Sequence, residues 1–136
     1  LAWYQWFSKD ALSRMYRQSW ELAESYPGAA IPVDQINGSV LLICGGQDMI
    51  WPSCDMAKAA KQRIEAGDTR KTDLLAYPDA GHWAFGPINN LDGYDRRGLG
   101  QTGGTAHSDM AARQDQWPKV LDFLHKTLAP SKELDK

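Results

Sequence analysis

The chain has 136 residues, of which 43% are hydrophobic and 24% charged, and its formal net charge is −2. This composition fits one globular domain and excludes a disordered chain. Because 15 basic residues nearly balance 17 acidic ones, nucleic acid and anionic membranes are not expected as partners. No apolar run approaches the roughly 18 residues that a membrane span needs, and no signal peptide is visible.

Residues 1–30 are predicted to form a helical lead-in. Asp10 is a candidate N-cap, and apolar residues recur at helical spacing as far as about Glu24. The aromatic stretch Trp3–Phe7 would be costly to expose at a frayed terminus. We therefore expect Leu1 to be a cut edge, with a preceding part of a longer protein covering those rings. The alternative is a terminus that folds onto its own core.

Residues 31–129 are predicted to form the folded core. Two short apolar runs, 39–44 and 71–77, are predicted strands, and a helix over about 54–65, with Ser53 as its candidate cap, lies between them. Both runs show little polar alternation, as strands covered on both faces do. A strand–helix–strand unit of this length predicts a parallel pair with a right-handed crossover. The fold class is therefore α/β, with parallel strands flanked by helices.

A last helix is predicted over about 106–128. The helix is predicted because residues repeat there at spacings of four and three, namely Met110, Gln114, Trp117, Leu121, Leu124 and Leu128. Pro118 either bends this helix or begins a new one. The tail, residues 130–136, is polar and expected to be mobile. Two parallel strands are too few for a stable covered sheet, so we expect the N-terminal half of the sheet to be absent from this chain.

The two cysteines, Cys44 and Cys54, do not suggest a disulfide framework. Cys44 lies in an apolar run and is predicted to pack as a small hydrophobic residue. A reduced, cytoplasmic chain is the simplest interpretation. Neither cysteine has a Cys or His at the spacing of a metal site, so no metal is expected.

Two polar residues follow the two predicted strands. Asp48 comes four residues after the strand 39–44, and His82 comes five residues after the strand that ends at Tyr77. Reactive groups in parallel α/β sheets gather in the loops at the carboxyl ends of strands, so we expect the two loops to meet. A carboxylate beside an imidazole orients the ring and stabilises its protonated form. Asp48 is thus predicted to hold His82 as a general base. The alternatives are an Asx-turn aspartate and a histidine that packs in a loop.

A general base of this kind needs a Ser or Cys nucleophile within hydrogen-bond reach. In α/β-hydrolases the nucleophile precedes the acid and the histidine, in a G-x-S-x-G-like elbow, and no such elbow is found. Ser53 and Cys54 come after the acid, at the start of a helix. We therefore expect the nucleophile and the oxyanion-hole donors to lie before residue 1.

The motifs together carry a family resemblance. They are Val40–Asp48, Trp51-Pro52-Ser53, Tyr77–His82, and Gly103-Gly104-Thr105 before Trp117 and Phe123-Leu124. The chain resembles the C-terminal catalytic domain of acyl-CoA thioester hydrolases and bile-acid-CoA:amino-acid N-acyltransferases, a dienelactone-hydrolase-like branch of the α/β hydrolases. The resemblance covers nearly the whole chain, and Trp-Pro-Ser is its most specific piece.

This resemblance implies a C-terminal part of an α/β-hydrolase fold and a thioester or ester substrate. In the family, a Ser or Cys attacks the thioester carbonyl, CoA leaves, and water or an amine takes the acyl group. By resemblance, Asp48 is the acid and His82 the base of the catalytic triad. Because the nucleophile is not in these 136 residues, the isolated chain is expected to be inactive.

Four further residues are candidates for binding the substrate, and two of them flank the acid and the base. Trp51 and Trp83 are candidate walls of an acyl pocket, with plain core packing as an equal alternative. Arg96 and Arg97 are candidate contacts for CoA phosphates, against the alternative of a solvated basic pair. Gly98–Gly103 formally matches G-x-G-x-x-G, but no strand precedes it, so no cofactor is expected.

Two functions from different classes follow. In the first, the chain supplies the acid and base of a hydrolase or acyltransferase whose N-terminal part lies elsewhere. In the second, it is a non-catalytic binding or self-assembly module, in which a second copy or another polypeptide covers the strand edges and Trp3–Phe7.

Overall fold

The computed structural model describes residues 11–67, 72–88 and 102–128. In chain order the helices and strands are α1 (Ala11–Leu22), β1 (Val40–Gly45), α2 (Ser53–Gly67), β2 (Thr72–Tyr77) and α4 (Ala106–Leu128). Short 3-10 turns connect them, including His82–Ala84 after β2. Within one or two residues, these bounds confirm the two strands and the last helix predicted from the sequence.

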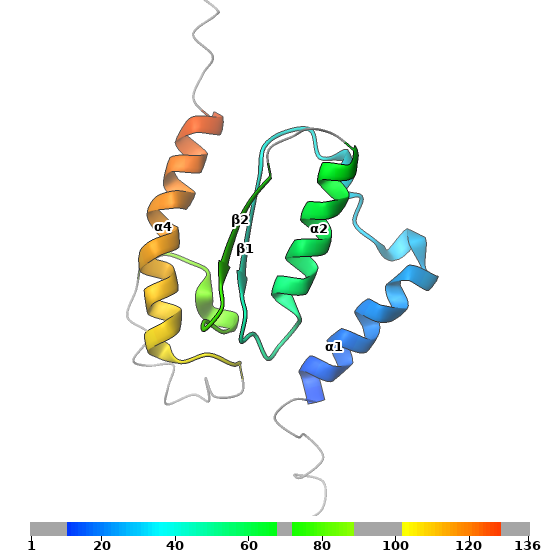
Figure 1. Cartoon of the computed structure of the whole chain (residues 1–136), viewed down its shortest axis with the longest axis horizontal. Coiled ribbons are helices and arrows are strands. Elements are labelled where there is room, and N and C mark those ends of the chain that lie inside the picture. Colours follow the sequence, from blue (N-terminus) through cyan, green and yellow to red (C-terminus); the bar gives the residue numbers. More distant parts are fainter. Residues whose placement is uncertain (1–10, 68–71, 89–101, 129–136) are drawn as a thin grey trace, which may run out of the picture.

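The strands β1 and β2 form a parallel pair. Their register runs from Val40 opposite Thr72 to Gly45 opposite Tyr77. The helix α2 connects them and lies on one side of the pair, with α1 beyond it, while α4 stands on the other side (Figure 1). The chain is therefore an α/β protein with helices on both sides of parallel strands, as predicted. Because both carboxyl ends lie at one edge, the loops after β1 and β2 are neighbours.

The helix α2 packs on the strands through Ala57 and Ile64, which are 8% and 1% exposed. It begins at Ser53, but the hydroxyl of Ser53 does not cap it. Instead Oγ donates a hydrogen bond to the carbonyl oxygen of Gly45 at 3.0 Å. Ser53 thus ties the first turn of α2 to the end of β1.

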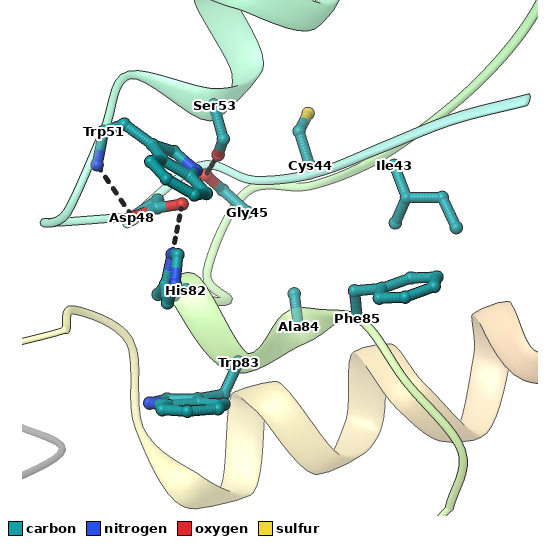
Figure 2. A pocket seen from close by; sticks show the side chains of 11 residues that line it. Ile43, Cys44, Gly45, Asp48, Trp51, Ser53, His82, Trp83, Ala84 and Phe85 are labelled. Atoms are coloured by element: carbon teal, nitrogen blue, oxygen red, sulfur yellow. Dashed lines mark hydrogen bonds and ion pairs between the residues drawn. The ribbon is translucent and has the colours of Figure 1, made fainter. Parts of the chain in front are cut away.

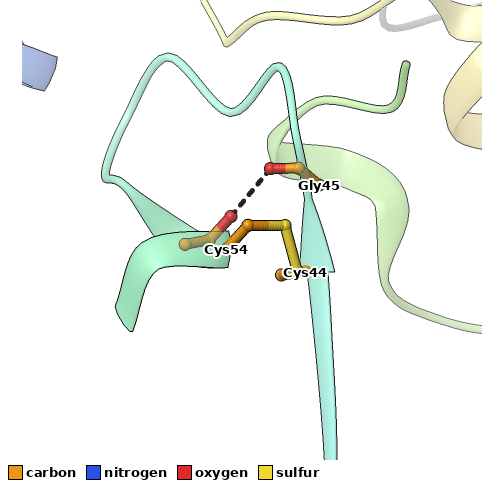
Figure 3. Close-up of a disulfide and its surroundings, with 4 residues drawn as sticks. Cys44, Gly45 and Cys54 are labelled. Atoms are coloured by element: carbon orange, nitrogen blue, oxygen red, sulfur yellow. Dashed lines mark hydrogen bonds between the residues drawn. A yellow bond between two sulfur atoms is a disulfide. The ribbon is translucent and has the colours of Figure 1, made fainter. Parts of the chain in front are cut away.

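The cysteine prediction is wrong, because Cys44 and Cys54 form a disulfide with a Cα–Cα distance of 5.0 Å. Figure 3 shows the bridge between the end of β1 and the first turn of α2. Cys44 is buried as expected, but its partner comes from the helix start that folds back beside the strand end. The inference of a reduced, cytoplasmic chain therefore loses its support from the cysteines. None of the described helices is long and apolar enough to cross a lipid bilayer.

The helix α4 runs without interruption through Pro118. The periodic residues that predict the helix are not its buried ones. The buried residues are Asp109, Ala112, Arg113 and Gln116, while Leu121, Leu124 and Leu128 are 41%, 40% and 75% exposed. The first half of α4 packs on the segment after β2, and Ala112 joins Ala80 and Ala84 in a small core. The main-chain N–H and C=O groups of that segment need hydrogen-bond partners, and polar residues on the facing side of the helix supply them.

Some sequence predictions fall outside the described residues and are not tested. They are the aromatic stretch Trp3–Phe7, the cap Asp10, the basic pair Arg96 and Arg97, the glycine-rich stretch Gly98–Gly103 up to residue 101, and the tail 130–136.

Candidate active site

The loop between β1 and α2 is organised around the side chain of Asp48. Its Oδ1 atom accepts hydrogen bonds from the main-chain N–H groups of Ile50 and Trp51, at 2.8 and 3.2 Å. The Asp48 side chain is 4% exposed. One carboxylate oxygen therefore shapes the loop in the manner of an Asx-turn, and the other oxygen points elsewhere.

That second oxygen faces His82. The Nδ1 atom of His82 lies 3.2 Å from Oδ2 of Asp48, and the imidazole is 24% exposed (Figure 2). A carboxylate at Nδ1 favours the tautomer with the proton on Nδ1, which leaves Nε2 as an acceptor. Within the described part of the chain, no hydrogen bond engages Nε2. The predicted contact is present, and its geometry suits an acid–base pair.

A third segment joins the two loops. The carbonyl oxygen of Thr102 accepts the N–H of Met49 at 3.2 Å and the N–H of His82 at 3.1 Å. In addition, Gln47 N–H donates to the carbonyl oxygen of Ala80 at 2.9 Å. The relative placement of acid and base is therefore held by the main chain as well as by their side chains.

Glycines allow these three segments to touch. A Cβ atom on Gly81 would lie 2.0 Å from the carbonyl oxygen of Gly103, and one on Gly103 would lie 1.6 Å from that of Gln47. Gly103 also has φ +77°, in the region that favours glycine. A side chain at Gly81 would push the Gly103 segment away from the loop of His82, and one at Gly103 would push that segment away from the loop of Asp48.

The helix α4 supplies side chains that sequence reasoning missed. The Oδ1 atom of Asp109 accepts the N–H of Gly81 at 2.6 Å, and Nε of Arg113 donates to the carbonyl oxygen of Trp83 at 2.7 Å. Burial raises the pKa of Asp109, against the lowering effects of the Gly81 N–H and of Arg113. In the sequence, the sign of this role is that Asp109 and Arg113 are charged residues four positions apart in the predicted last helix. That helix packs on the segment that carries His82.

A pocket of about 390 Å³ opens beside the pair. Its lining includes Ile43, Asp48, Trp51, His82, Trp83 and Phe85 (Figure 2). The ring of Trp51 lies 4.9 Å from the imidazole of His82, centroid to centroid, and that of Trp83 lies 5.7 Å from it, both edge-on. Both predicted tryptophans therefore contact the imidazole and line the pocket.

Neither Ser53 nor Cys54 is placed as a nucleophile. The Ser53 hydroxyl donates to Gly45, and the Cys54 sulfur is bonded to Cys44. Among the described residues, no group of three or more His, Cys, Asp or Glu side chains is arranged to hold a metal ion.

These features define the class of protein: an α/β fold that brings an aspartate and a histidine together at the carboxyl ends of adjacent parallel strands. Residues 4–130 match the family described as BAAT / Acyl-CoA thioester hydrolase C terminal, and the chain belongs to this family.

The chain is also similar to curated acyl-coenzyme A thioesterases. The chain is 29% identical over 103 residues to acyl-coenzyme A thioesterase 2, mitochondrial, of Rattus norvegicus, which covers 73% of this chain and 23% of the relative. It is 29% identical over 102 residues to acyl-coenzyme A thioesterase 1 of Homo sapiens, covering 72% and 24%, and 28% identical over 111 residues to acyl-coenzyme A thioesterase 3 of Mus musculus, covering 76% and 25%. The aligned part is thus about a quarter of each relative's length.

Proposed function

We propose that this chain is the C-terminal part of an α/β-hydrolase domain that acts on acyl-CoA thioesters. In this proposal residues 31–129 carry the acid and base, residues 1–30 lead into them, and residues 130–136 form a tail. The observation that carries the proposal is the 3.2 Å contact between His82 Nδ1 and Asp48 Oδ2, in a chain whose family is named for thioester hydrolysis.

The proposed reaction begins with a Ser or Cys from a segment outside these 136 residues. Nε2 of His82 takes the proton of this nucleophile as it attacks the thioester carbonyl carbon. Asp48 stabilises the imidazolium that forms, and Nε2–H then protonates the departing CoA sulfur. In the second half, His82 takes a proton from water, or from an amine in an acyltransferase, as that acceptor attacks the acyl-enzyme. Nε2–H then returns the proton to the Ser or Cys as the bond to the acyl group breaks.

The pocket beside His82 supports an apolar substrate group. Its walls include Ile43, Trp51, Trp83 and Phe85, and apolar walls with a few polar groups are typical of small-molecule sites. We propose that Trp51 and Trp83 contact the thioester end of the acyl chain. Arg96 and Arg97 are proposed contacts for the CoA phosphates, because guanidinium groups pair with phosphate oxygens.

The rest of the sheet is proposed to come from the part of the protein that precedes this chain. Among the described residues β1 pairs with β2 alone, so its other edge has no strand there. Leu121, Leu124 and Leu128 are exposed on α4. Further strands and their helices would cover such an edge and such apolar side chains.

The test is thioester hydrolysis by the full-length protein that contains this chain. His82→Ala is expected to lower kcat by about 10³–10⁴-fold or more, because the base is lost, with the far-UV circular dichroism spectrum unchanged. His125→Ala is the matched control, since His125 is exposed near the end of α4. Full activity of His82→Ala would refute the proposal.

A second candidate function is a binding or self-assembly module. The edge of β1 that pairs with no strand of the described residues and the exposed leucines of α4 favour it, since association covers strand edges and apolar side chains of this kind. Mass measurement in solution beside the thioesterase assay separates the two functions. A stable inactive dimer supports assembly, whereas activity restored by adding the upstream fragment supports a split enzyme.

A further inference from the structure

The buried face of α4 is polar where the helix meets the segment that carries His82. Asp109, Arg113 and Gln116 are 1%, 5% and 0% exposed. Their spacing of four and three residues puts them on one face of the helix. Burying polar groups is unfavourable unless they are hydrogen-bonded, so their partners indicate what this face does.

Two of these residues bind the main chain on either side of His82. Asp109 Oδ1 accepts the N–H of Gly81, the residue before His82, at 2.6 Å. Arg113 Nε donates to the carbonyl oxygen of Trp83, the residue after His82, at 2.7 Å. His82 therefore lies between two main-chain anchors that come from adjacent turns of one helix.

A further contact extends the same pattern. Gln116 Nε2 donates to the carbonyl oxygen of Gly86 at 2.7 Å, so each of the three buried polar residues binds the segment after β2. The side chains are spread along about two turns of helix, and their partners are spread along six residues of that segment.

The start of α4 is itself fixed. Ser108 Oγ accepts the N–H of Thr105 at 2.9 Å, and Thr105 Oγ1 accepts the N–H of Ser108 at 3.0 Å. This reciprocal capping holds the first turn, to which Asp109 belongs. The carboxylate of Asp109 also lies at the end of the helix where the dipole favours a negative charge.

We propose that Asp109 and Arg113 are positioning residues for His82, holding the main chain before and after it so that Nδ1 stays on Asp48. Neither residue is assigned a contact with substrate. The proposal rests on the proposed function of His82 as the base. A small misplacement of a catalytic group lowers the rate without abolishing binding, so the effect belongs to kcat.

Because only one oxygen of Asp109 has a partner within the described part of the chain, two variants can test whether that hydrogen bond positions His82. Oδ2 has no hydrogen-bond partner among the described residues, and Oδ1 alone binds Gly81. Asp109→Asn keeps an acceptor at Oδ1, whereas Asp109→Ala leaves the Gly81 N–H without one. Arg113→Lys and Arg113→Met form the corresponding pair, since Lys keeps a donor and Met only the length.

The first experiment measures thioester hydrolysis by the full-length protein. Asp109→Ala is expected to lower kcat by about 10- to 100-fold, as a displaced catalytic group does, with KM changed less than about twofold. Asp109→Asn is expected to restore most of the lost kcat. Ile64→Val serves as the control, because Ile64 is buried in α2 and outside the site, and is expected to lower the Tm without lowering kcat.

The second experiment needs no turnover. The amide proton of Gly81 is followed by NMR in the same protein, where a hydrogen bond to a carboxylate is expected to shift it strongly downfield. Asp109→Ala is expected to move this signal upfield, and Asp109→Asn to move it less.

The proposal is overturned if Asp109→Ala keeps its kcat or its Gly81 signal, or if Asn and Ala lower kcat equally. It is also overturned if Ile64→Val, where it lowers the Tm as much as Asp109→Ala does, lowers kcat as much as Asp109→Ala does. Should Asp109→Ala not fold, Arg113→Met against Arg113→Lys decides by kcat alone, because Arg113 binds the carbonyl oxygen of Trp83 and not the Gly81 amide. A loss of kcat in Arg113→Met that Arg113→Lys restores supports the proposal, and an unchanged kcat in Arg113→Met overturns it. Failure of the proposed function is distinguishable, because His82→Ala would then stay active while the Gly81 signal still reports on Asp109.

Discussion

Oδ2 of Asp48 lies 3.2 Å from Nδ1 of His82, while Oδ1 of the same carboxylate accepts two main-chain N–H groups of its own loop. The two sequence interpretations of Asp48, as a loop residue and as a partner of the imidazole, therefore both describe it. Because the loop bonds fix the carboxylate, its second oxygen is held in place before any substrate arrives.

This division leads to a prediction for Asp48→Asn in the full-length protein. The amide oxygen is expected to keep the loop bonds, while the amide NH₂ replaces Oδ2 and donates to Nδ1. The imidazole then carries its proton on Nε2 and cannot accept one there, so kcat is expected to fall by about 10⁴-fold.

The Tm of Asp48→Asn is expected to stay close to that of the wild type. Asp48→Ala loses the loop bonds as well, and we expect about 1–3 kcal/mol of lost stability from the unpaired amides. Thermal unfolding measures the difference. Equal stability of the Asn and Ala variants would contradict the role of Oδ1.

The disulfide predicts a redox-dependent stability. The bridge joins residues ten apart and closes the loop that contains Asp48. Reduction is expected to lower the free energy of unfolding by about 3 kcal/mol, from the entropy regained by the unfolded chain. Denaturant unfolding with and without a thiol reductant measures this. The double variant Cys44→Ala with Cys54→Ala is expected to be insensitive to the reductant, and an insensitive wild type would refute the bridge.

Gly103→Ala is expected to destabilise the fold strongly. The added Cβ would meet the carbonyl oxygen of Gln47 at 1.6 Å, at a residue with φ +77°. Main-chain atoms cannot give way as a flexible side chain can, so we expect a loss of about 3 kcal/mol or more.

Gly28→Ala is the matched control for this strain. A Cβ at Gly28 would meet nothing within 4 Å, and the expected change is within about 0.5 kcal/mol. Denaturant unfolding of both variants compares them. Similar effects at the two positions would contradict the close approach at Gly103.

Asp109 predicts a pH dependence of stability. Burial raises its pKa in the folded protein above the ordinary value of 3.8. Between these two values the folded state binds more protons than the unfolded state, so the contribution of Asp109 to stability falls as pH rises. This contribution to stability is largest below pH 3.8 and is lost as the pH rises through the pKa that Asp109 has in the folded protein.

Asp109→Asn isolates this effect, because the amide does not titrate. The free energy of unfolding of the wild type minus that of Asp109→Asn is expected to fall as pH rises through the window above 3.8, and then to level off. Denaturant unfolding across that pH range gives the difference. A difference that rises with pH would show that the folded pKa is lowered instead.

The helices and strands, and the contact between Asp48 and His82, could be predicted from sequence patterns. The apolar runs before Asp48 and before His82 predicted parallel strands, and the carboxyl ends of such strands share one edge. That rule is independent of side-chain detail, which explains why the contact of Asp48 with His82 was predictable.

Contacts that depend on how the elements approach one another could not be predicted from the sequence. Cys44 and Cys54 bond because the start of α2 folds back on the end of β1, and their spacing alone does not show that return. The buried face of α4 is likewise polar at Asp109 and Arg113, since it packs on main-chain groups of the segment after β2 that accept and donate hydrogen bonds. Hydrophobic periodicity assumes an apolar surface opposite the helix, and here the opposite surface combines Ala80 and Ala84 with main-chain amide and carbonyl groups that need polar partners.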